Sequence, residues 1–520
     1  MKIQKNIFQY ILLNSKKNKT AIIFQGKKIS YKSLNEIVSN LSISLIKIGI
    51  RKNDKIGLVL HNSLEFIYIM LAAAKIGAAI VPLNTTLPIP TIVSSLLFTK
   101  VKFLISWHSV LNKILLNNKF KRTFKNKTIS VGSQIDNCRY FQDLIKKNKN
   151  YRKEINQAHF INKNYIISLT SGSTGSPKPI ILTQKTKVLR ALLVKKLYKL
   201  TSKDIVIAAT PLEHSLSQRL VFLPLIMGAT LVLLKNFTNK IWINEVKKNR
   251  VSFSILVASQ IESIFKSKKN NLKKLNSLKT LVSTSAKLSE NFKNKISLFS
   301  NCNFYEWYGA SEIATATNLR LNKESKKIKS VGKACPGVKI KIINHKNHPV
   351  KYGTIGEISC KTTQIFSGYL NKKNETKNFF YKDYFKTGDL GYLDKDKYLY
   401  LVGRKKNMII VGGINVYAED VEQTIKKLPL IKDCCVIGVD DDRFGEAIVA
   451  IIIWKKGIKK DLNLLKNYCF ENLADFQQPL SFVFTDKFPR NMLGKILRND
   501  LKNRYIKSNL SNTISGLMKN

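Results

Sequence analysis

Residues 168–180, SLTSGSTGSPKPI, form a loop-like stretch between two runs rich in β-branched residues, YII at 165–167 and IIL at 180–182. The stretch differs from the G-x-x-x-x-G-K-[ST] loop of nucleotide-binding proteins, because Pro177 precedes Lys178 and a strand-like segment follows in place of a helix. Two interpretations are open at this point. The stretch is an ordinary hairpin turn, or it is a loop whose backbone N–H groups, hydroxyls and Lys178 hold a di- or triphosphate.

Length and charge bound the class of protein. The 520 residues exceed what one compact core holds, so we expect two or more domains. A hydrophobic content of 44% is typical of a globular protein. The net charge of +56 would suit a nucleic-acid binder. The lysines are scattered along the chain together with many Asn and Ile residues, however, which indicates a coding bias, and we predict no specific nucleic-acid partner. A basic surface still attracts anionic substrates.

Cysteine and histidine spacing argues against a disulfide framework or a zinc site. The seven cysteines contain no C-x-x-C pair and the six histidines no H-E-x-x-H pattern. We expect reduced thiols in a cytoplasmic protein. The best apolar candidate for a membrane span, residues 71–83, is interrupted by Lys75, so no transmembrane segment is predicted. The basic N-terminus, residues 1–19, lacks a small-residue cleavage site and is predicted to form a short amphipathic helix.

An alternation of apolar runs and helical patterns predicts the fold class. DKIGLVL (54–60) and AAIVPLN (78–84) are strand-like and flank a helical pattern at 63–77. The same order recurs at 204–234, and two further strand-like runs lie between residues 251 and 284. Alternation of this kind predicts α/β layers with a largely parallel sheet.

The C-terminal part of the chain has a different texture. Short strands with Gly turns begin at about residue 330 and indicate a β-rich module. A compact segment follows, with a helical pattern at 417–428 and strand-like runs at 434–439 and 446–454. We place a domain boundary near residues 405–406.

Five short segments then decide the family. In chain order they are TSGSTGSPK (170–178), WYGASE (307–312), YFKTGDLG (384–391), GRKKNMIIVGGINV (403–416) and PRNMLGKILR (489–498). Together they resemble the motifs of the adenylate-forming, or AMP-binding, superfamily, and most of all those of its acyl-CoA synthetases. That superfamily also contains the adenylation domains of peptide synthetases and the luciferases. The N-terminal segments ISYKSLNEIV, HNSLEF and GAAIVPLN extend the resemblance over nearly the whole chain.

The resemblance implies a fold and a division into domains. We expect an α/β protein whose large N-terminal domain, residues 1–403, consists of two α/β layers plus a β-barrel. A hinge would follow at 404–406, and a small mobile C-terminal α+β lid domain at 407–505. Residues 506–520 would form a basic tail.

The resemblance also implies a reaction. Enzymes of this superfamily couple a carboxylate to the α-phosphorus of ATP and release pyrophosphate, and a thiol then attacks the acyl-adenylate. Both steps build negative charge on oxygen atoms, so aimed donors, a lysine and Mg²⁺ are needed. We therefore expect ATP, Mg²⁺ and CoA as cofactors and a carboxylic acid as substrate.

Matching the motifs residue by residue implies a nucleotide site. The residues that would hold the phosphates are Thr170, Ser171, Gly172, Ser173, Thr174, Gly175 and Lys178. Those implied around the nucleoside are Ser285, Ala286, Tyr308, Gly309, Ala310 and Ser311, with Tyr308 stacked on adenine. Glu312 would hold Mg²⁺; the alternative is that YGASE is only a strand-to-helix turn with an exposed acid. Asp389 would accept both ribose hydroxyls; the alternative is an Asx turn, and both can hold at once. Arg404 would contact ribose or phosphate.

The C-terminal motifs imply the remaining roles. Lys495 would bridge the substrate carboxylate and the α-phosphate in the first half-reaction. Lys406 matches the hinge about which the lid rotates between the two half-reactions. Gly412 and Gly413 would bring a glycine loop to the tunnel for the pantetheine thiol.

Three positions depart from the usual motifs. Pro179 stands where Gly commonly follows the loop lysine, and it stiffens the chain there. Thr284-Ser285-Ala286 replaces Gly-Gly-Ala or Gly-Ser-Ala, and Ala418 replaces a frequent Pro. None of these changes removes a charged catalytic group, so we expect activity.

The substrate and the acceptor are inferred from single positions. His214 matches the histidine that lines or gates the acyl pocket; the alternative is a packed core histidine. Ser215 occupies the place where relatives that activate amino acids carry an Asp, which favours a simple fatty or aryl acid. No carrier domain is fused to the chain, so CoA is the first choice of acceptor and a separate phosphopantetheinyl carrier protein the second. A non-catalytic, nucleic-acid-binding relic of the fold is the remaining alternative, and the presence of Lys178, Glu312, Asp389 and Lys495 argues against it.

Overall fold

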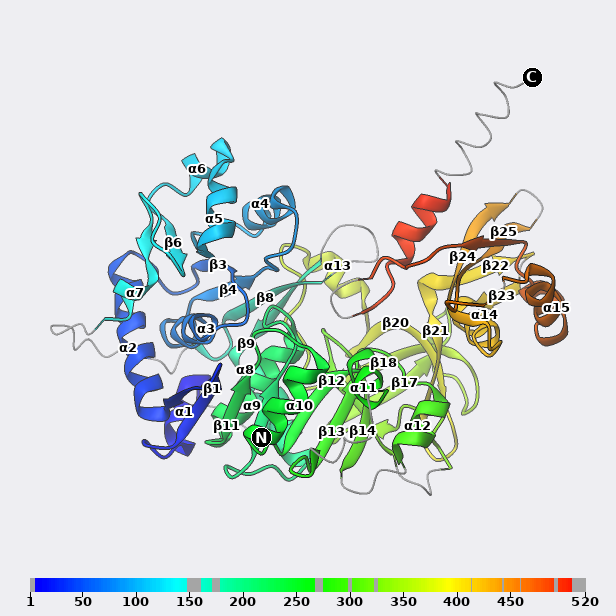
Figure 1. The fold of residues 1–520 in the computed structure, drawn as a ribbon, viewed down its shortest axis with the longest axis horizontal. Helices are drawn as coiled ribbons and strands as arrows, with labels where there is room; N and C mark the ends of the chain where they lie inside the picture. The colour runs from blue at the N-terminus through cyan, green and yellow to red at the C-terminus, as the bar shows by residue number, and fades with distance from the viewer. Residues whose placement is uncertain are drawn as a thin grey trace. The chain divides into compact units, whose positions relative to one another are not determined.

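The computed structural model describes residues 5–146, 160–170, 178–266, 275–297, 302–321, 326–412, 414–441, 444–458, 460–490 and 494–506. The chain forms two units (Figure 1). Unit 1 consists of residues 1–328, 335–338 and 361–380, and unit 2 of residues 329–334, 339–360 and 381–520. The predicted hinge at 404–406 lies within unit 2 and remains a prediction.

The first sheet of unit 1 carries the loop with which the sequence analysis began. Its order is β7-β6-β5-β3-β4-β8-β9, and all neighbours are parallel except the antiparallel pair β8 and β9. The strands are β3 (Lys55–Val59), β4 (Ala79–Pro82), β5 (Phe103–Trp107), β6 (Thr128–Val131), β7 (Arg139–Tyr140), β8 (Asn164–Thr170) and β9 (Lys178–Thr183). The strand–helix–strand unit predicted at 54–84 is confirmed as β3, α3 (Leu64–Ile76) and β4.

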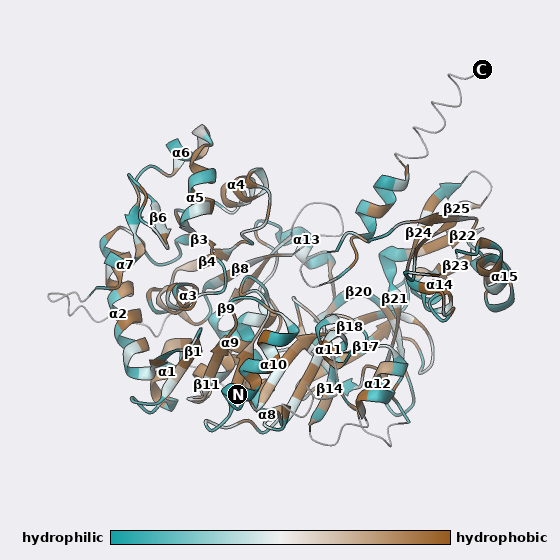
Figure 2. Cartoon of the chain, viewed as in Figure 1, coloured by the Kyte–Doolittle hydropathy of each residue, from teal (hydrophilic) through white to brown (hydrophobic). Residues whose placement is uncertain are grey.

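The second sheet of unit 1 is also mainly parallel. Its strands run in the order β15-β14-β13-β12-β10-β11-β1-β2, with antiparallel pairs only at the two ends. They are β1 (Thr20–Phe24), β2 (Lys27–Ser30), β10 (Ile205–Ala208), β11 (Thr230–Leu233), β12 (Phe253–Val257), β13 (Thr280–Thr284), β14 (Asn303–Ala310) and β15 (Ala314–Leu321). Figure 2 colours its central strands mostly brown, which fits strands that are buried on both faces.

Several of the helices that accompany these sheets begin at residues whose side chains cap the helix. The helices of unit 1 are α1 (Ile7–Asn14), α2 (Tyr31–Lys47), α3, α4 (Ile89–Phe98), α5 (His108–Leu115), α6 (Asn118–Thr123), α7 (Phe141–Leu144), α8 (Gln184–Leu197), α9 (Ser215–Met227), α10 (Asn239–Lys248), α11 (Ala258–Phe265), α12 (Glu290–Ser297) and α13 (Lys373–Asn378). The N-terminal helix predicted from the sequence is confirmed as α1, where Asn6 and Gln9 form a capping box. Helix α3 starts at the N-cap Ser63 and ends at Gly77 in the left-handed region.

Unit 2 contains two sheets, in which the parallel pair β25 and β26 accompanies antiparallel pairs. The β-rich module predicted from about residue 330 forms a sheet in the order β17-β18-β20-β19, with β21 paired to β20. Its strands are β17 (Val338–Ile343), β18 (Gly356–Thr362), β19 (Phe380–Tyr381), β20 (Tyr384–Leu393) and β21 (Leu399–Arg404); the short β16 (Lys333–Ala334) precedes them.

The other sheet of unit 2 runs in the order β23-β22-β25-β24, with β26 paired to β25. Its elements are η3 (Lys405–Asn407), β22 (Met408–Val411), β23 (Ile414–Tyr417), α14 (Ala418–Ile425), β24 (Ile431–Asp441), β25 (Gly445–Trp454), α15 (Leu462–Asn472), η4 (Asp475–Gln477) and β26 (Ser481–Phe484). Both faces of β24 are apolar, since Cys434 belongs to one buried cluster and its neighbour Cys435 to another. Among the described residues of the whole chain, no helix combines the length and apolar character that a membrane crossing requires.

Gly228, which ends α9 with φ +71°, provides a test of the packing of α1 against α9. A Cβ at this residue would lie 2.0 Å from the carbonyl oxygen of Asn14. An alanine in the left-handed region lowers the stability of the folded state by about 1–2 kcal/mol. Gly228→Ala should lower it by about 2 kcal/mol more, because of the close contact. Gly26→Ala is the matched control, because Gly26 has φ +81° with no atom within 4 Å of the added Cβ. Thermal unfolding of both variants checks the difference, and equal losses would contradict the packing described.

Candidate active site

The loop predicted to hold phosphates is closed by a strand pair. Thr170, the last residue of β8, is opposite Lys178, the first residue of β9, and Leu169 is opposite Pro179. The predicted hairpin with a strand after Lys178 is thus confirmed. Ser171, Gly172, Ser173, Thr174 and Gly175 lie outside the described residues, so their predicted role remains a prediction.

The WYGASE segment forms the end of β14 and the tight turn, residues 311–313, that leads into the antiparallel β15, and it is not the strand-to-helix turn that was the alternative. Gly309 is required there because a Cβ would lie 1.8 Å from the carbonyl oxygen of Ala314. Ala314 itself has φ +63°. The turn places Glu312 between the two strand ends.

Arg190, on α8, holds this turn in place. Its Nη2 donates to the backbone oxygens of Ser311 and Glu312, at 2.9 and 3.1 Å, and its Nε donates to that of Gln364 at 3.1 Å. The Glu312 side chain is fixed separately, since Oε1 accepts a hydrogen bond of 3.0 Å from the Tyr369 hydroxyl. The predicted metal-binding carboxylate therefore has a defined position.

Glu312 fits Mg²⁺ as part of a nucleotide complex. Mg²⁺ in phosphate-transfer sites is bound through one or two carboxylates plus substrate phosphates and water. Within the part of the chain that the structure describes, no group of three or more His, Cys, Asp or Glu side chains is placed to bind a metal ion. One carboxylate with the remaining ligands from ATP is the arrangement that these residues suit.

A cavity of about 130 Å³ adjoins the turn. Its lining residues are Arg190, Ser215, Leu216, Arg219, Thr284, Ser285, Trp307, Tyr308, Gly309, Ala310, Ser311, Ala314 and Thr315. The structure thus brings together five of the residues predicted around the nucleoside, Ser285 and Tyr308 to Ser311, whereas Ala286 is exposed and outside the lining. Ser285 has φ +74°, a conformation that favours the glycine found in the usual motif.

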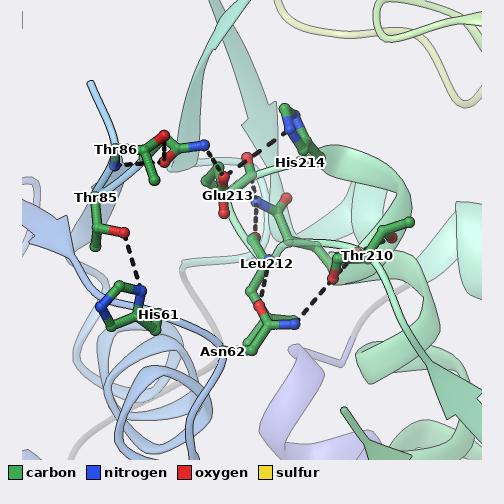
Figure 3. A network of polar contacts seen from close by, with 11 residues as sticks. His61, Asn62, Thr85, Thr86, Thr210, Leu212, Glu213 and His214 are labelled. Atoms are coloured by element: carbon green, nitrogen blue, oxygen red, sulfur yellow. Dashed lines mark hydrogen bonds and ion pairs between the residues drawn. The ribbon is translucent and has the colours of Figure 1, made fainter. Parts of the chain in front are cut away.

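His214 is positioned by a polar network from three separate segments (Figure 3). Asn62 accepts a 2.8 Å hydrogen bond from the Leu212 amide and donates to the backbone oxygens of Thr210 and Leu234. Asn84 donates at 2.8 Å to Oε1 of Glu213. These bonds fix the loop that ends at His214, the residue before α9. Asn62 of HNSLEF and Asn84 of GAAIVPLN therefore hold the loop that carries His214, the histidine predicted to line the acyl pocket.

Burial changes the proton affinity of both side chains in this loop. It raises the pKa of Glu213 from 4.5 to about 7, because the carboxylate is poorly solvated there. It lowers the pKa of His214, whose Nε2 lies 4.0 Å from Glu213 Oε1 and makes no hydrogen bond among the described residues. At neutral pH the imidazole next to α9 is therefore uncharged.

The other predicted residues meet in unit 2. Asp389 on β20 is opposite Arg404 on β21, and Arg404 Nε lies 2.6 Å from Asp389 Oδ1. Asp389 lies within β20, and the Asx turn that was the second interpretation stays a prediction. The carboxylate is buried while Arg404 remains half-buried. The chain thus presents a fixed carboxylate with an arginine beside it, which is the arrangement expected for a ribose contact.

Lys495 belongs to the same group of charges. Burial and the neighbouring Arg404 lower the pKa of Lys495 to about 8, and Asp389 acts in the opposite direction. Lys406, in η3, has its pKa lowered by burial and then by Arg404 and Arg498. Residues more than 100 positions apart in the sequence are thus close together.

The segment that carries Lys495 is fastened to β24. Arg490 donates to the Gly494 backbone oxygen at 2.7 Å and pairs with Asp433. Arg498 pairs with Glu422 and donates to the backbone oxygen of Val436 on β24. The same Glu422 accepts a 2.7 Å hydrogen bond from the Val436 amide. These contacts hold the segment that carries Lys495 against β24 and α14.

Gly412, the first glycine of the predicted pantetheine loop, has φ +56° and open space where a Cβ would stand. Its partner Gly413 lies outside the described residues. The role of both glycines remains a prediction.

Sequence reasoning missed several residues that shape the site. Arg190, Arg219 and Tyr369 carry no motif, and Asn62 and Asn84 lie in segments that were recognised only as general likeness. The signal for the two asparagines was present, since both are polar residues that directly follow or border buried strands.

Comparisons with known proteins now identify the family. A family model described as AMP-binding enzyme matches residues 12–370, and one described as AMP-binding enzyme C-terminal domain matches residues 420–495. The chain belongs to the AMP-binding enzyme family. Its class is that of the AMP-forming acid–thiol ligases, which use ATP, Mg²⁺ and CoA.

Named relatives in the family are similar over nearly their whole length. Indoleacetate–CoA ligase of Aromatoleum aromaticum is 26% identical over 494 residues, which cover 93% of this chain and 94% of that protein. 2-Succinylbenzoate–CoA ligase of Listeria monocytogenes is 28% identical over 490 residues, with 94% and 97% covered. Acyl- or aryl-CoA ligase activity is supported by these relatives.

Solved structures of the family show the same fold. ATP-bound MatB from Rhodopseudomonas palustris has a TM-score of 0.87 at 24% identity and covers 96% of this chain and 99% of its own. The o-succinylbenzoate CoA synthetase MenE from Bacillus subtilis, in complex with the acyl-adenylate intermediate OSB-AMP, has a TM-score of 0.83 at 24% identity, with 95% and 97% covered. The predicted α/β architecture with a large N-terminal and a small C-terminal domain is confirmed by this likeness.

Glu213 gives a pH-dependent prediction for stability. Because its pKa is raised in the folded state, the folded state favours the protonated acid, and stability falls as pH rises from about 4.5 to about 7. Glu213→Gln resembles the protonated acid and removes this loss. The variant should match the wild type near pH 4.5 and be more stable by about 3 kcal/mol above pH 7.

Thermal midpoints measured between pH 4.5 and 8.5 check this expectation. Glu36→Gln, at an exposed position on α2, is the matched control and should leave the pH profile unchanged. A Glu213→Gln effect of the same size at every pH would contradict the buried neutral carboxyl group.

Proposed function

We propose that the protein activates a fatty or aryl carboxylic acid with ATP to the acyl-adenylate, releases pyrophosphate, and transfers the acyl group to the thiol of CoA. The observation that carries the proposal is the group of Asp389, Arg404 and Lys495 in unit 2. Three motifs that are distant in sequence supply, at one place, a carboxylate for ribose and cations for phosphate.

Lys495 is the residue that we assign to the first half-reaction. As the carboxylate oxygen attacks the α-phosphorus, charge grows on the non-bridging phosphate oxygens, and a fixed ammonium stabilises it. The same ammonium holds the attacking carboxylate in place. A lysine is suited to both tasks, because it is a compact point charge with three donors.

The residues of unit 1 are assigned to the nucleotide and to Mg²⁺. Tyr308 lines the cavity beside Ser285 and would stack on adenine. Glu312, held by Tyr369, would bind Mg²⁺, which when bound offsets charge on the phosphates. Thr170 and Lys178 stand at the two ends of the proposed phosphate loop.

The acid is assigned to the start of α9. His214 is neutral and held in place by the network around Asn62 and Asn84, as a residue that shapes a pocket requires. Ser215 lines the cavity, and by sequence match it would stand where relatives that activate amino acids carry an aspartate for the substrate ammonium. This supports an acid without an α-amino group.

CoA is assigned as the acceptor because the named relatives are CoA ligases. Gly412 would leave room for the pantetheine arm, and Lys406 would be the pivot that exchanges Lys495 for that arm. Transfer to a separate carrier protein is distinguished by supplying CoA or a phosphopantetheinylated carrier in the second half-reaction.

The first test is acid-dependent exchange of pyrophosphate into ATP, with a panel of fatty, aryl and amino acids. Lys495→Ala should reduce the exchange by at least about 100-fold, as expected when a charge-stabilising group is lost. The variant should unfold at the wild-type temperature. Lys502→Ala, on a neighbouring position of the same C-terminal segment, is the control and should retain exchange.

Absence of exchange with every acid, combined with salt-dependent retention of the protein on DNA, would overturn the proposal in favour of the nucleic-acid-binding alternative. Exchange that is unaffected by Lys495→Ala would remove the role assigned to that lysine.

The pKa of Lys495 predicts the alkaline limit of the first half-reaction. The ammonium is present below pH 8 and is lost as pH rises through about 8. Exchange at low ATP concentration should therefore fall about tenfold between pH 7 and pH 9. In Lys495→Arg, which keeps its charge, the residual activity should not fall in this range. An alkaline limit at the same pH in both enzymes would contradict the assignment.

A further inference from the structure

Three cationic side chains are buried around the first turn of α9. Lys187 and Arg190 lie on α8, and both reach Ser215, with Lys187 Nζ and Arg190 Nη1 at 3.3 and 3.1 Å from its Oγ. Arg219 follows Ser215 by one helical turn on α9 and lines the same cavity. Each of the three residues is at least nine-tenths buried.

Among the described residues, the hydrogen bonds of these three side chains go to neutral groups, and the Glu312 carboxylate acts on Arg190 only from beyond ion-pair distance. Lys187 donates to the side-chain oxygen of Gln218, and Arg190 donates to backbone oxygens and Ser215. No Asp or Glu oxygen of the described chain lies within ion-pair distance of Lys187, Arg190 or Arg219. An unpaired buried charge is costly, because water is lost without compensation.

Arg219 is the member whose bonding is incomplete. Its Nη1 donates to Thr315 Oγ1 at 2.8 Å, and its guanidinium lies over the ring of Trp307, 5.3 Å from the centroid. Its Nε is buried and has no hydrogen-bond partner in the described structure. The side chain is thus held rigidly at the cavity wall with a donor that nothing satisfies.

Burial lowers the pKa of Arg219 to about 10. Burial and then the charge of Arg219 lower the pKa of Arg190 to about 9, and Glu312 acts in the opposite direction. Both guanidinium groups remain charged at neutral pH. Burial also lowers the pKa of Lys187 well below its ordinary value.

We propose that Arg219, supported by Arg190 and Lys187, binds a second carboxylate of the acid substrate, so that the preferred substrate is a dicarboxylic acid. This rests on the proposed function. A guanidinium at the wall of a cavity suits a carboxylate, which it binds with charge-assisted hydrogen bonds.

The position of Arg219 indicates that it binds a carboxylate of the acid substrate and not a phosphate of ATP. Arg219 shares the α9 wall of the cavity with Ser215 and Leu216, and His214 of the proposed acyl pocket directly precedes them. The neutral His214 adds no cation of its own, so the guanidinium groups provide the fixed positive charge of this wall. An acid with one carboxylate would leave that charge unpaired.

The experiment compares acids that differ only in the second charge. Adipic acid is paired with its monomethyl ester and with hexanoic acid, and homophthalic acid with its monoesters and phenylacetic acid. Pyrophosphate exchange gives kcat/KM for each acid and KM for ATP. The wild type should prefer the diacid of a matched set by at least about tenfold, the scale of one charged hydrogen bond.

Arg219→Met should lower the ratio of kcat/KM for the diacid to that for its monoester by about 10- to 100-fold. Arg219→Lys should fall between this variant and the wild type, since it keeps the charge without the planar edge. Arg320→Met, at an exposed position on β15, makes the same change of net charge and should leave the ratio unchanged.

Three outcomes overturn the proposal. A wild type that exchanges pyrophosphate with monocarboxylic acids and rejects every diacid removes it while leaving the proposed function intact. A higher KM for ATP in Arg219→Met, with an unchanged ratio, assigns the anion to a phosphate. Absence of exchange with any acid removes the proposed function as well. The comparison of acids on the wild-type enzyme remains decisive if Arg219→Met does not fold.

Discussion

The hydrogen bonds of Arg190 are the interaction on which the geometry of unit 1 depends. One guanidinium gathers the carbonyl oxygens of Ser311, Glu312 and Gln364 and the hydroxyl of Ser215. It therefore links the turn that carries Glu312, the segment after β18 and the start of α9. A guanidinium that donates several hydrogen bonds is held rigidly. Removing this side chain would leave several buried acceptors without partners.

Much of the fold could be predicted because it is encoded locally. The alternation of apolar runs and helical patterns at 54–84 and 204–234 gave the strands β3, β4, β10 and β11 and the helices between them. The need for a glycine in WYGASE is also explained locally, since the chain reverses direction within five residues and leaves no room for a Cβ at Gly309. Motif order then predicted roles for Glu312, Asp389 and Lys495, and the grouping of Asp389 with Lys495 agrees with that prediction.

The rest could not be predicted because its cause is long-range. Arg190 contacts residues 25 to 174 positions away, and nothing in its neighbourhood distinguishes it from the other 88 lysines and arginines of the chain. The same holds for Arg219, whose partner Thr315 is 96 residues away. In a chain with so many cations, composition conceals the few that are buried, and only tertiary structure separates a solvated charge from one held in a cavity.

The Glu422–Arg498 pair has a consequence for how copies of this protein meet one another. Strand β24 lies at the edge of its sheet, and an edge strand offers unpaired amides and carbonyls to any extended chain that approaches. At Val436 both of these groups are already taken, the amide by Glu422 and the carbonyl by Arg498. Two side chains thus occupy the place of a further strand, and they protect a long, apolar β-ribbon against aggregation by edge-to-edge addition.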